Sequence, residues 1–271
     1  MRNEEIIQKY GPWALVAGAS EGLGAAFAHS AAARGLNVVL VARRFDVLET
    51  VAAELQAEHK ISTRQIVADL SEGNAPARIA GAVADLEIGM LISNAASEPQ
   101  GAFLDLPLER HLFAIDVNCR APLALAHHFG RSMVARKRGS IVLVTSLGGL
   151  CGLPVFSSYG ASKAFEWNLG ECLWDELSPH GVDALSFVVG STRTPNLERS
   201  GAPEAHLKEA VAPNLVAENL FDVLDQGPTQ YSMPEVAEAA RGLFSISRKE
   251  AVGYFSTQNH ASFPSTTDRI K

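Results

Sequence analysis

Short apolar runs alternate with helical patterns along most of the chain. The runs lack the polar alternation of a half-exposed strand, which indicates strands covered on both faces. Apolar residues between them recur at helical spacing, first over 23–34 and then over 47–59. Strands are predicted at 14–17, 37–42, 64–68, 90–93, 140–145 and 184–189.

Strands that alternate with helices predict a parallel sheet with right-handed crossovers. The expected fold is therefore α/β, a Rossmann-type doubly wound parallel sheet with helices on both faces. The chain shows no repeat, no low-complexity linker and no break in composition. We expect a single domain over 1–271, with a cofactor-binding half over about 12–145.

The stretch over 192–230 interrupts this rhythm with several prolines and glycines around two short helical patterns. Irregular segments of this length inside a compact domain are usually functional, so we expect a lid over the substrate. Regular structure is predicted to resume at Ser232, which forms a capping box with Glu235 ahead of a helix.

Composition narrows the class of protein. With 47% apolar and 20% charged residues, the chain is expected to be globular, and no apolar run reaches the roughly 20 residues of a membrane helix. The N-terminus lacks the apolar core of a signal peptide, so a cytoplasmic location is expected. The net charge of −7 argues against a nucleic-acid partner. The basic tract at 136–138 is interpreted as a solvated helix end, and the three cysteines lack metal-ligand spacing, so no metal is expected.

A glycine-rich turn follows the first predicted strand. Gly18, Gly22 and Gly24 are spaced G-x-x-x-G-x-G directly before a helix. Glycine lets the backbone turn tightly and approach a pyrophosphate, while the helix N-terminus offers amide groups and partial positive charge. The pattern predicts a dinucleotide site.

Two arginines stand at the end of the second strand, where an acidic residue would bind the ribose 2′-hydroxyl of NAD. Arg43 and Arg44 follow Ala42 there. A guanidinium binds a 2′-phosphate through charge-assisted bonds, so NADP(H) is the predicted cofactor. Glu21 lies in the turn nearby, and the preference is therefore assigned to Arg43 first and Arg44 second.

Tyr159 and Lys163 are four residues apart, which places them on one face of a helix. A nearby ammonium, together with oxidised nicotinamide, favours the phenolate and lowers the pKa of a tyrosine that otherwise ionises near 10. Ser146 ends a strand, where its hydroxyl can donate to a substrate oxygen that gains negative charge. The set predicts acid–base chemistry at a carbonyl or alcohol.

These motifs together resemble the short-chain dehydrogenase/reductase family over about 14–244. The resemblance implies that Tyr159 exchanges the proton, Ser146 positions the substrate oxygen, and Lys163 lowers the tyrosine pKa and binds the nicotinamide ribose. Asn118 would hold a water that links the lysine to solvent. Asp69 would hold the adenine amino group and Thr194 the carboxamide. Implied cofactor contacts also include Ser20, Leu23, Leu70, Asn94, Ala95, Ala96, Gly190 and Thr192.

The chain departs from the family pattern in three places. Ala17 replaces the usual threonine before the turn, Ala96 the usual glycine, and Val189 the usual proline. None of these changes removes a reacting group.

The substrate site is expected at the carboxyl ends of the strands, beneath the 192–230 segment. Its candidate wall residues are largely apolar, which favours an alicyclic, aromatic or lipid-like carbonyl or alcohol. They are Ser97, Gly148, Leu153, Phe156 and Leu197. The polar tail over 253–271 gives no indication of a role.

The expected function is NADP(H)-dependent interconversion of a ketone or aldehyde and an alcohol. Two alternatives remain open: a C=C reductase or epimerase on the same fold, and a non-catalytic NADP(H)-binding sensor or scaffold. The family resemblance also implies a homodimer or homotetramer, and no membrane partner is expected.

Overall fold

The computed structural model describes residues 2–263 of the chain. It contains a parallel sheet in the order β3-β2-β1-β4-β5-β6-β7. The order reverses between β1 and β4, the topological switch point at which doubly wound folds bind dinucleotides. The strands are β1 (Trp13–Ala17), β2 (Asn37–Ala42), β3 (Thr63–Val67), β4 (Ile88–Ser93), β5 (Gly139–Ser146), β6 (Val182–Val189) and β7 (Thr229–Tyr231).

Successive strand residues enter two different cores, which explains why polar alternation is absent from the sequence. In β1, Ala14 and Val16 pack on one face, whereas Leu15 and Ala17 pack on the other. Both faces are therefore closed to water, as expected for a parallel sheet. The predicted fold class is confirmed.

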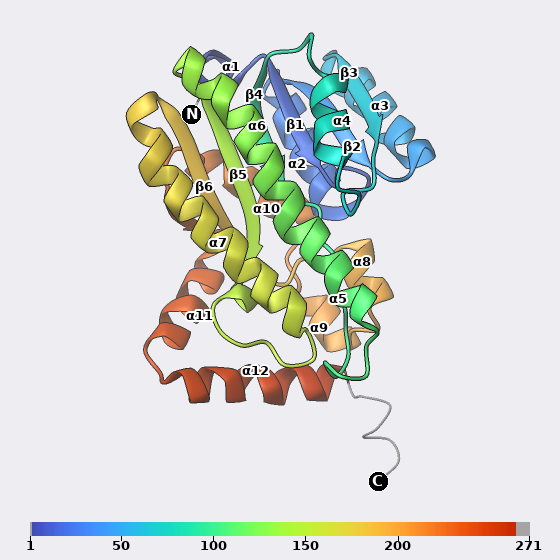
Figure 1. Cartoon of the computed structure of the whole chain (residues 1–271), viewed down its shortest axis with the longest axis vertical. Helices are drawn as coiled ribbons and strands as arrows, with labels where there is room; N and C mark the ends of the chain where they lie inside the picture. The colour runs from blue at the N-terminus through green and yellow to red at the C-terminus, as the bar shows by residue number, and fades with distance from the viewer. Residues whose placement is uncertain (1, 264–271) are drawn as a thin grey trace.

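Helices cover both faces of the sheet (Figure 1). One layer consists of α2 (Gly22–Ala33), α3 (Phe45–His59) and α10 (Pro213–Val223). The other consists of α4 (Ala75–Ala82), α6 (Ala121–Arg136) and the long α7 (Ser157–Leu177). None of the helices in the described part of the chain has the length and apolar character to cross a membrane.

The remaining helices gather mainly at the carboxyl ends of the strands, while α1 (Asn3–Tyr10) lies at the opposite end. The C-terminal α12 runs across the bottom of the molecule in Figure 1. The elements at the carboxyl ends are α5 (Leu108–Ile115), the π-helix η1 (Asp116–Arg120), the 3-10 turn η2 (Leu147–Gly149), α8 (Pro195–Arg199), α9 (Glu204–Glu209), α11 (Pro234–Phe244) and α12 (Arg248–Ser262). A second 3-10 turn, η3 (Ser178–His180), lies away from this edge.

Half of the predicted lid belongs instead to the core. The segment over 192–230 contains α8 and α9, but it also contains α10 and β7, a strand the sequence did not predict. The side chains of Val216, Leu220 and Phe221 in α10 are buried against α2. Two short helical patterns were predicted in this stretch, but its prolines and glycines indicated a lid and did not show that α10 packs into the core.

The predicted capping box at Ser232 is wrong. The helix α11 begins at Pro234 with Met233 as its N-cap, because proline suits the first helical position. Ser232 is buried just after β7, and its hydroxyl accepts a hydrogen bond from the Gly190 amide at 3.4 Å.

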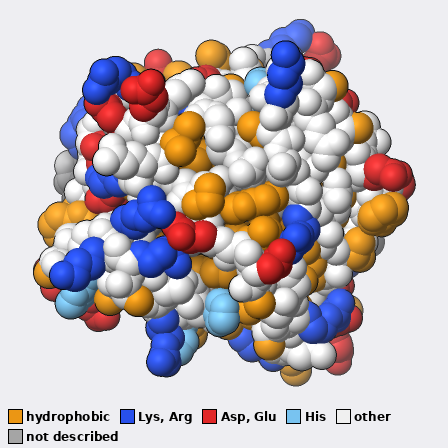
Figure 2. All heavy atoms as spheres, turned by 90° about the horizontal axis from the view of Figure 1, so that it is seen from above, with side chains coloured by type: hydrophobic (Ala, Val, Ile, Leu, Met, Phe, Trp, Pro, Cys, Tyr) orange, Lys and Arg blue, Asp and Glu red, His pale blue; other side chains and the backbone are white. Residues whose placement is uncertain are grey.

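The basic tract does mark a helix end, as predicted. Arg136 closes α6 and Lys137 adopts the left-handed cap conformation. Arg138 pairs with Glu87. Figure 2 views the molecule from above, the end where α1 lies, and there basic and acidic side chains are interspersed. This face carries no single-sign patch of the kind that binds nucleic acid.

The assignment of α10 to the core can be tested by cavity formation. Leu220 is fully buried and Leu215, on the same helix, is 52% exposed. The Leu220→Ala substitution is expected to lower the free energy of unfolding by about 2–5 kcal/mol, the usual cost of a core cavity. Leu215→Ala should change it by less than about 1 kcal/mol. Urea denaturation measures both, and equal small effects would mean that α10 is a mobile lid.

Candidate active site

The glycine turn between β1 and α2 is closely surrounded by backbone. Gly18 and Gly22 have φ values of +85° and +57°, a region that side chains disfavour. A Cβ on Gly24 would lie 1.8 Å from the Gly18 carbonyl oxygen, and one on Gly18 would lie 2.7 Å from the Cα of Ala95. Conformation favours glycine at Gly18 and Gly22, and lack of space requires it at Gly18 and Gly24.

The end of β4 supports this turn. Asn94 donates from Nδ2 to the Gly18 carbonyl oxygen at 3.2 Å, which connects the first and fourth strands at the switch point. Asp69 follows β3, and its carboxylate accepts bonds from the Ser71 amide and hydroxyl at 2.9 and 2.8 Å. Leu23 and Leu70 are buried, and Ala96 is exposed.

The turn and the start of α2 fit a pyrophosphate. Glu21 is the extended N-cap, yet its side chain makes no capping hydrogen bond. The first amides of the helix are therefore left for an anion, and the three glycines let the turn pack closely enough to present them. Gly18, Ser20, Gly22, Leu23 and Gly24 would hold the pyrophosphate of a dinucleotide.

Glu21 is the acidic centre of an ion-pair cluster beside this turn. It pairs with Arg44 at 2.7 Å and also with Arg199 of α8. The Arg199 guanidinium, followed by that of Arg44, lowers the pKa of the Glu21 carboxyl. Arg43 is exposed at the end of β2. Because Arg44 already has an acidic partner, Arg43 is the better placed of the two for an added phosphate.

Ser146 and Tyr159 lie at the carboxyl end of β5 and in the first turn of α7. The Ser146 hydroxyl accepts a hydrogen bond from the Gly148 amide at 3.1 Å, which fixes its orientation as η2 begins. Burial raises the pKa of the Tyr159 phenol, followed by the negative charge of Glu98, while a hydrogen bond with Ser146 lowers it. In the protein alone, Tyr159 is therefore held in its protonated form.

Lys163 is almost completely buried one turn further along α7. Its Nζ donates to the Val144 carbonyl oxygen at 2.8 Å and to the Glu166 carboxylate at 2.6 Å. The same Nζ lies 5.8 Å from the centroid of the Tyr159 ring. The expected proximity of lysine and tyrosine is observed, but the ammonium has an acidic partner that the sequence argument did not include.

Asn118 lies in the π-helix between α5 and α6, a local irregularity typical of functional sites. Its side chain is fully buried and connects the Ser97 backbone to α7. Oδ1 accepts from the Ser97 amide at 2.7 Å, and Nδ2 donates to the Ser97 carbonyl and the Ser162 hydroxyl, both at 2.8 Å. Asn118 therefore positions the catalytic helix against the end of β4.

The segment after β6 reaches the glycine turn. Thr194 caps α8 by accepting a bond from the Leu197 amide at 3.2 Å. A Cβ on Gly22 would lie 3.0 Å from the Thr194 side chain. Thr192 donates to the Gly190 carbonyl at 3.2 Å. The structure thus brings the predicted nicotinamide-binding segment to the cofactor turn.

The predicted substrate walls divide into two groups. Ser97 and Leu197 are half-buried in two segments that meet, because Asn196 donates to the Glu98 carboxylate at 3.3 Å. Phe156 is instead buried against Phe263, with ring centroids 5.1 Å apart, because α12 covers this loop. Leu153 packs beside Gly148 and Gly160, whose added Cβ atoms would lie within 2.8 Å of it. Phe156 is thus a packing residue, so the prediction of it as a substrate wall is not supported.

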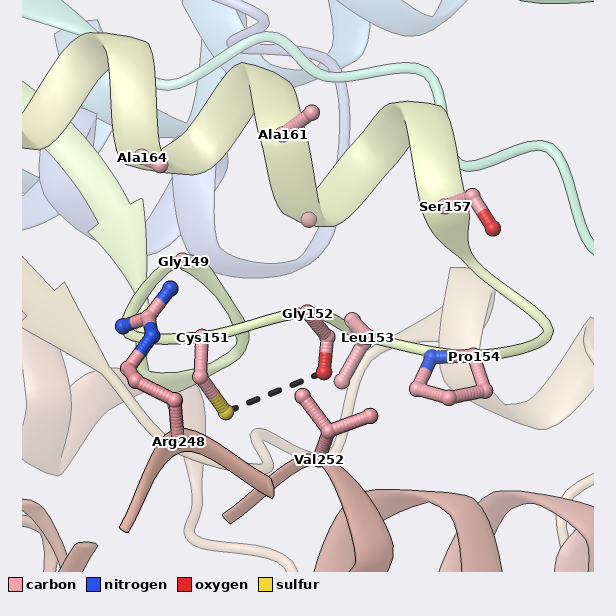
Figure 3. Close-up of a pocket in the computed structure, with 11 residues that line it drawn as sticks. Gly149, Cys151, Gly152, Leu153, Pro154, Ser157, Ala161, Ala164, Arg248 and Val252 are labelled. Atoms are coloured by element: carbon pink, nitrogen blue, oxygen red, sulfur yellow. Dashed lines mark hydrogen bonds between the residues drawn. The ribbon is translucent and has the colours of Figure 1, made fainter.

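A pocket of about 430 Å³ lies between the loop before α7, α7 itself and α12 (Figure 3). The residues that line this pocket do not include Ser146, Tyr159 or Lys163. Arg248 and Val252 of α12 face the loop there. The pocket therefore lies beside the three predicted catalytic residues, on the side of α7 that faces α12.

The helix α12 braces the loop that precedes Tyr159. Arg248 donates to the Leu150 carbonyl at 2.6 Å, and Asn259 donates to the Pro154 carbonyl at 2.9 Å. Within this loop Val155 has a φ of +74°, which is strained for a β-branched residue. Much of the 253–271 tail thus has a structural role; the rest, 264–271, lies outside the described residues.

Three side chains near Tyr159 and Lys163 were not predicted from the sequence. Glu98 and His111 are brought there by folding and no local motif marks them, whereas Glu166 lies on the same helix as Lys163. His111 is buried on α5, with its ring nitrogens 2.9 Å from the Ser158 hydroxyl and 3.0 Å from the Phe103 carbonyl. An acid three residues after Lys163, on the same helix face, was the one available signal for Glu166.

A group of possible metal ligands lies on the outer surface of α2 and α3, away from this site. His29, Glu58 and His59 have ligand atoms within 4.8 Å of one another. No spacing along the sequence marks this group, because His29 lies on α2 whereas Glu58 and His59 lie on α3. The three cysteines do not form a disulfide with one another.

Comparisons with known proteins agree with this geometry. The family model of the short chain dehydrogenases matches residues 12–205. A 7beta-hydroxysteroid dehydrogenase from Collinsella aerofaciens is 35% identical over 221 residues, which cover 80% of this chain and 84% of the relative. The chain belongs to the short-chain dehydrogenase/reductase family.

Two solved structures are similar over most of the chain. A structure described for 7beta-hydroxysteroid dehydrogenase stereoselectivity has a TM-score of 0.88 at 30% identity, covering 93% of this chain and 99% of that one. A short-chain dehydrogenase from Sphingobium yanoikuyae in complex with NADPH has a TM-score of 0.76 at 30% identity, covering 88% and 96%. The family is one of oxidoreductases that act on hydroxyl groups with a nicotinamide dinucleotide.

The crowding at Gly24 generates a direct test of the cofactor turn. The Gly24→Ala substitution is expected to weaken dinucleotide binding at least tenfold, because its Cβ must displace the Gly18 carbonyl. Gly81→Ala in α4 is the control, since a Cβ there meets nothing within 4 Å. Fluorescence titration with NADPH measures both variants. Equal affinities would contradict the assignment of the turn.

Proposed function

We propose that this chain is an NADP(H)-dependent hydroxysteroid dehydrogenase that interconverts a steroid ketone and the corresponding alcohol. The observation that carries the proposal is the placement of Ser146, Tyr159 and Lys163 at the same sheet edge as the glycine turn. One end of the molecule thus supplies both a proton-transfer group and a dinucleotide cradle.

The reaction balances as ketone plus NADPH plus a proton giving alcohol plus NADP⁺. NADPH held by the glycine turn would supply the hydride that the carbonyl carbon gains. Tyr159 donates its phenolic proton to the carbonyl oxygen in reduction, and its phenolate accepts the hydroxyl proton in oxidation. The tyrosine exchanges that proton with solvent between turnovers.

The other side chains favour the charge changes of this step. Ser146 has its orientation fixed by the Gly148 amide, and its hydroxyl can donate to the substrate oxygen as negative charge develops there. Lys163 brings an ammonium within 5.8 Å of the Tyr159 ring, which favours the phenolate. Asn118 holds α7 and the end of β4 in register, as its three hydrogen bonds indicate.

Two features support a steroid-sized substrate. The relatives named above act on the 7β position of hydroxysteroids, and one of them resembles this chain along nearly its whole length. The segments that border the carboxyl edge also expose apolar side chains, among them Phe103, Leu104 and Leu215. An apolar alicyclic substrate would cover such side chains.

We also propose a cofactor contact, an oligomeric state and a cellular location. Arg43 is proposed to bind the 2′-phosphate of NADP(H). A homodimer is proposed because α5 exposes Leu108, Leu112 and Ile115 along one face, a stripe that a second copy would cover. A cytoplasmic location is proposed as the ordinary site of NADP(H)-dependent metabolism.

The function is tested by NADPH oxidation with 7-keto steroids, and by NADP⁺ reduction with 7β-hydroxysteroids. Tyr159→Phe is expected to lower kcat by about 10²–10⁴-fold, the usual contribution of a general acid–base group. Tyr254→Phe in α12 is the matched control, because that ring is 49% exposed and outside the site.

Turnover of wild type and the control, with loss in Tyr159→Phe, would support the proposal. Turnover of simple cyclic ketones alone would retain the chemistry and contradict the steroid assignment. NADPH binding without turnover of any carbonyl would favour a sensor or scaffold.

Cofactor preference is tested at Arg43 and Glu21. Arg43→Ala is expected to lower kcat/KM for NADPH about tenfold, since a charge-assisted hydrogen bond contributes about 1.5–3 kcal/mol, and to leave NADH unaffected. Glu21→Gln should improve NADPH binding, because a negative charge that occupies Arg44 is removed. Arg78→Ala, at a surface pair with Glu72, is the control. A wild-type preference for NADH would contradict the assignment.

A further inference from the structure

Glu166 lies at the centre of the catalytic helix and has no exposed surface. Its Oε2 accepts a hydrogen bond from the Lys163 ammonium at 2.6 Å. The same ammonium donates to the Val144 carbonyl at 2.8 Å, so β5 and Glu166 together hold it. The side chain thus touches the lysine of the proposed reaction and does not touch the substrate region.

The other carboxylate oxygen indicates that this pair has a role beyond stability. Among the described residues, Oε1 of Glu166 is one of the few buried side-chain atoms without a hydrogen-bond partner. A buried carboxylate that is only half satisfied is costly, and a buried ion pair contributes little to stability compared with apolar packing. Buried ionisable groups of this kind cluster at functional sites.

We propose that Glu166 is a positioning residue that acts through Lys163: its charge offsets that of the ammonium and so sets the pH range over which Tyr159 exchanges its proton. The inference rests on the proposed function, because it concerns the same proton transfer. It adds a residue that neither the motif nor its spacing includes.

The electrostatics of the site support this role. The negative charge of Glu166 raises the pKa of Tyr159, in addition to the larger effects of burial and Glu98. Burial raises the pKa of Glu166 itself to about 7, although the Lys163 ammonium opposes the rise. Glu166 therefore changes its charge close to neutrality, where a small shift in pH alters the field at Tyr159.

Few other ionisable groups face this pair from the elements packed on α7. Glu98 lies in the loop after β4, and Cys119 lies in the π-helix, where burial and then Glu166 raise its pKa to about 11. Cys119 is therefore neutral at the relevant pH. His111 of α5 is bound to Ser158 and Phe103. From β5, the contacts to Lys163 are the uncharged Val144 carbonyl and Thr145 hydroxyl.

Further along α7, Glu171 accepts bonds from Trp167 and from Thr229 of β7. Tyr231 of β7 contacts the Trp167 ring on that side. These groups do not contact Lys163, which makes Glu171 a suitable control.

The sign of the effect follows from the reaction. Oxidation needs the Tyr159 phenolate, so its rate rises with pH through the pKa of that phenol. Above about pH 7 the charged Glu166 raises this pKa and moves the rise to higher pH. Removing the charge must therefore move the rise to lower pH.

The first test compares Glu166→Gln with Glu171→Gln, two changes of the same chemistry on the same helix. The pH midpoint of kcat/KM for oxidation is expected to fall by about one unit in Glu166→Gln, the size of a neighbouring-charge effect, and to stay fixed in Glu171→Gln. A general structural defect would lower the rate at every pH without moving the midpoint. An unchanged midpoint would overturn the proposal.

The second test needs no turnover. The chain has four tyrosines, so labelling with [¹³Cζ]tyrosine gives four NMR signals, and Tyr159→Phe identifies the one of interest. In the NADP⁺ complex, the Tyr159 signal is expected to titrate about one pH unit lower in Glu166→Gln than in wild type. Tyr231 reports any general disturbance of the helix.

If Glu166→Gln does not fold, the pH titration of the Tyr159 signal in the wild-type protein still tests the proposal. That signal should show an additional inflection near pH 7, as Glu166 ionises beside Lys163. A single inflection would contradict the inference. A wild-type protein that titrates as described yet turns over no carbonyl would leave the role of Glu166 intact and would contradict the proposed function instead.

Discussion

Burial of the sheet on both faces is the constraint on which the rest of the molecule depends. Successive residues of each strand enter different cores, so neither face can present polar groups to a ligand. The strands can offer such groups only where they end, and in a parallel sheet these ends lie at one edge. The glycine turn after β1, Asn94 after β4 and Ser146 at the end of β5 meet there for this reason.

The same burial determines how the acid–base groups behave. Lys163 is held beneath the surface by a β5 carbonyl and by Glu166, and Tyr159 is held protonated by its surroundings. Glu166 has no exposed surface, so water screens its charge poorly and that charge acts on the phenol. Two sets of hydrogen bonds hold this arrangement: α12 binds the loop before α7, and the Asn118 side chain binds Ser162 of α7. Reactivity here thus depends on packing as much as on the three reacting residues.

The fold and the proximity of Tyr159 to Lys163 could be predicted because local sequence patterns determine both. Apolar runs identified six of the seven strands to within one or two residues, and the spacing of Tyr159 and Lys163 follows helical geometry. The three-residue β7 has too few residues for a pattern, and α10 was hidden by flanking prolines. Glu98 and His111 reach the site through tertiary contacts, which no local pattern encodes. The packing of Phe156 against Phe263 could not be predicted either, because a loop sequence does not reveal that α12 covers it.

The central claim is that hydride passes from NADPH to a steroid carbonyl carbon under proton transfer from Tyr159. The most direct measurement is the transfer of deuterium from C4-deuterated NADPH to a 7-keto steroid, followed by mass spectrometry of the product. The account predicts one deuterium on the new carbinol carbon with only one of the two C4 epimers of the labelled cofactor, and a loss of labelled product in Tyr159→Phe. Tight binding of the labelled cofactor with no deuterium in any steroid would contradict it.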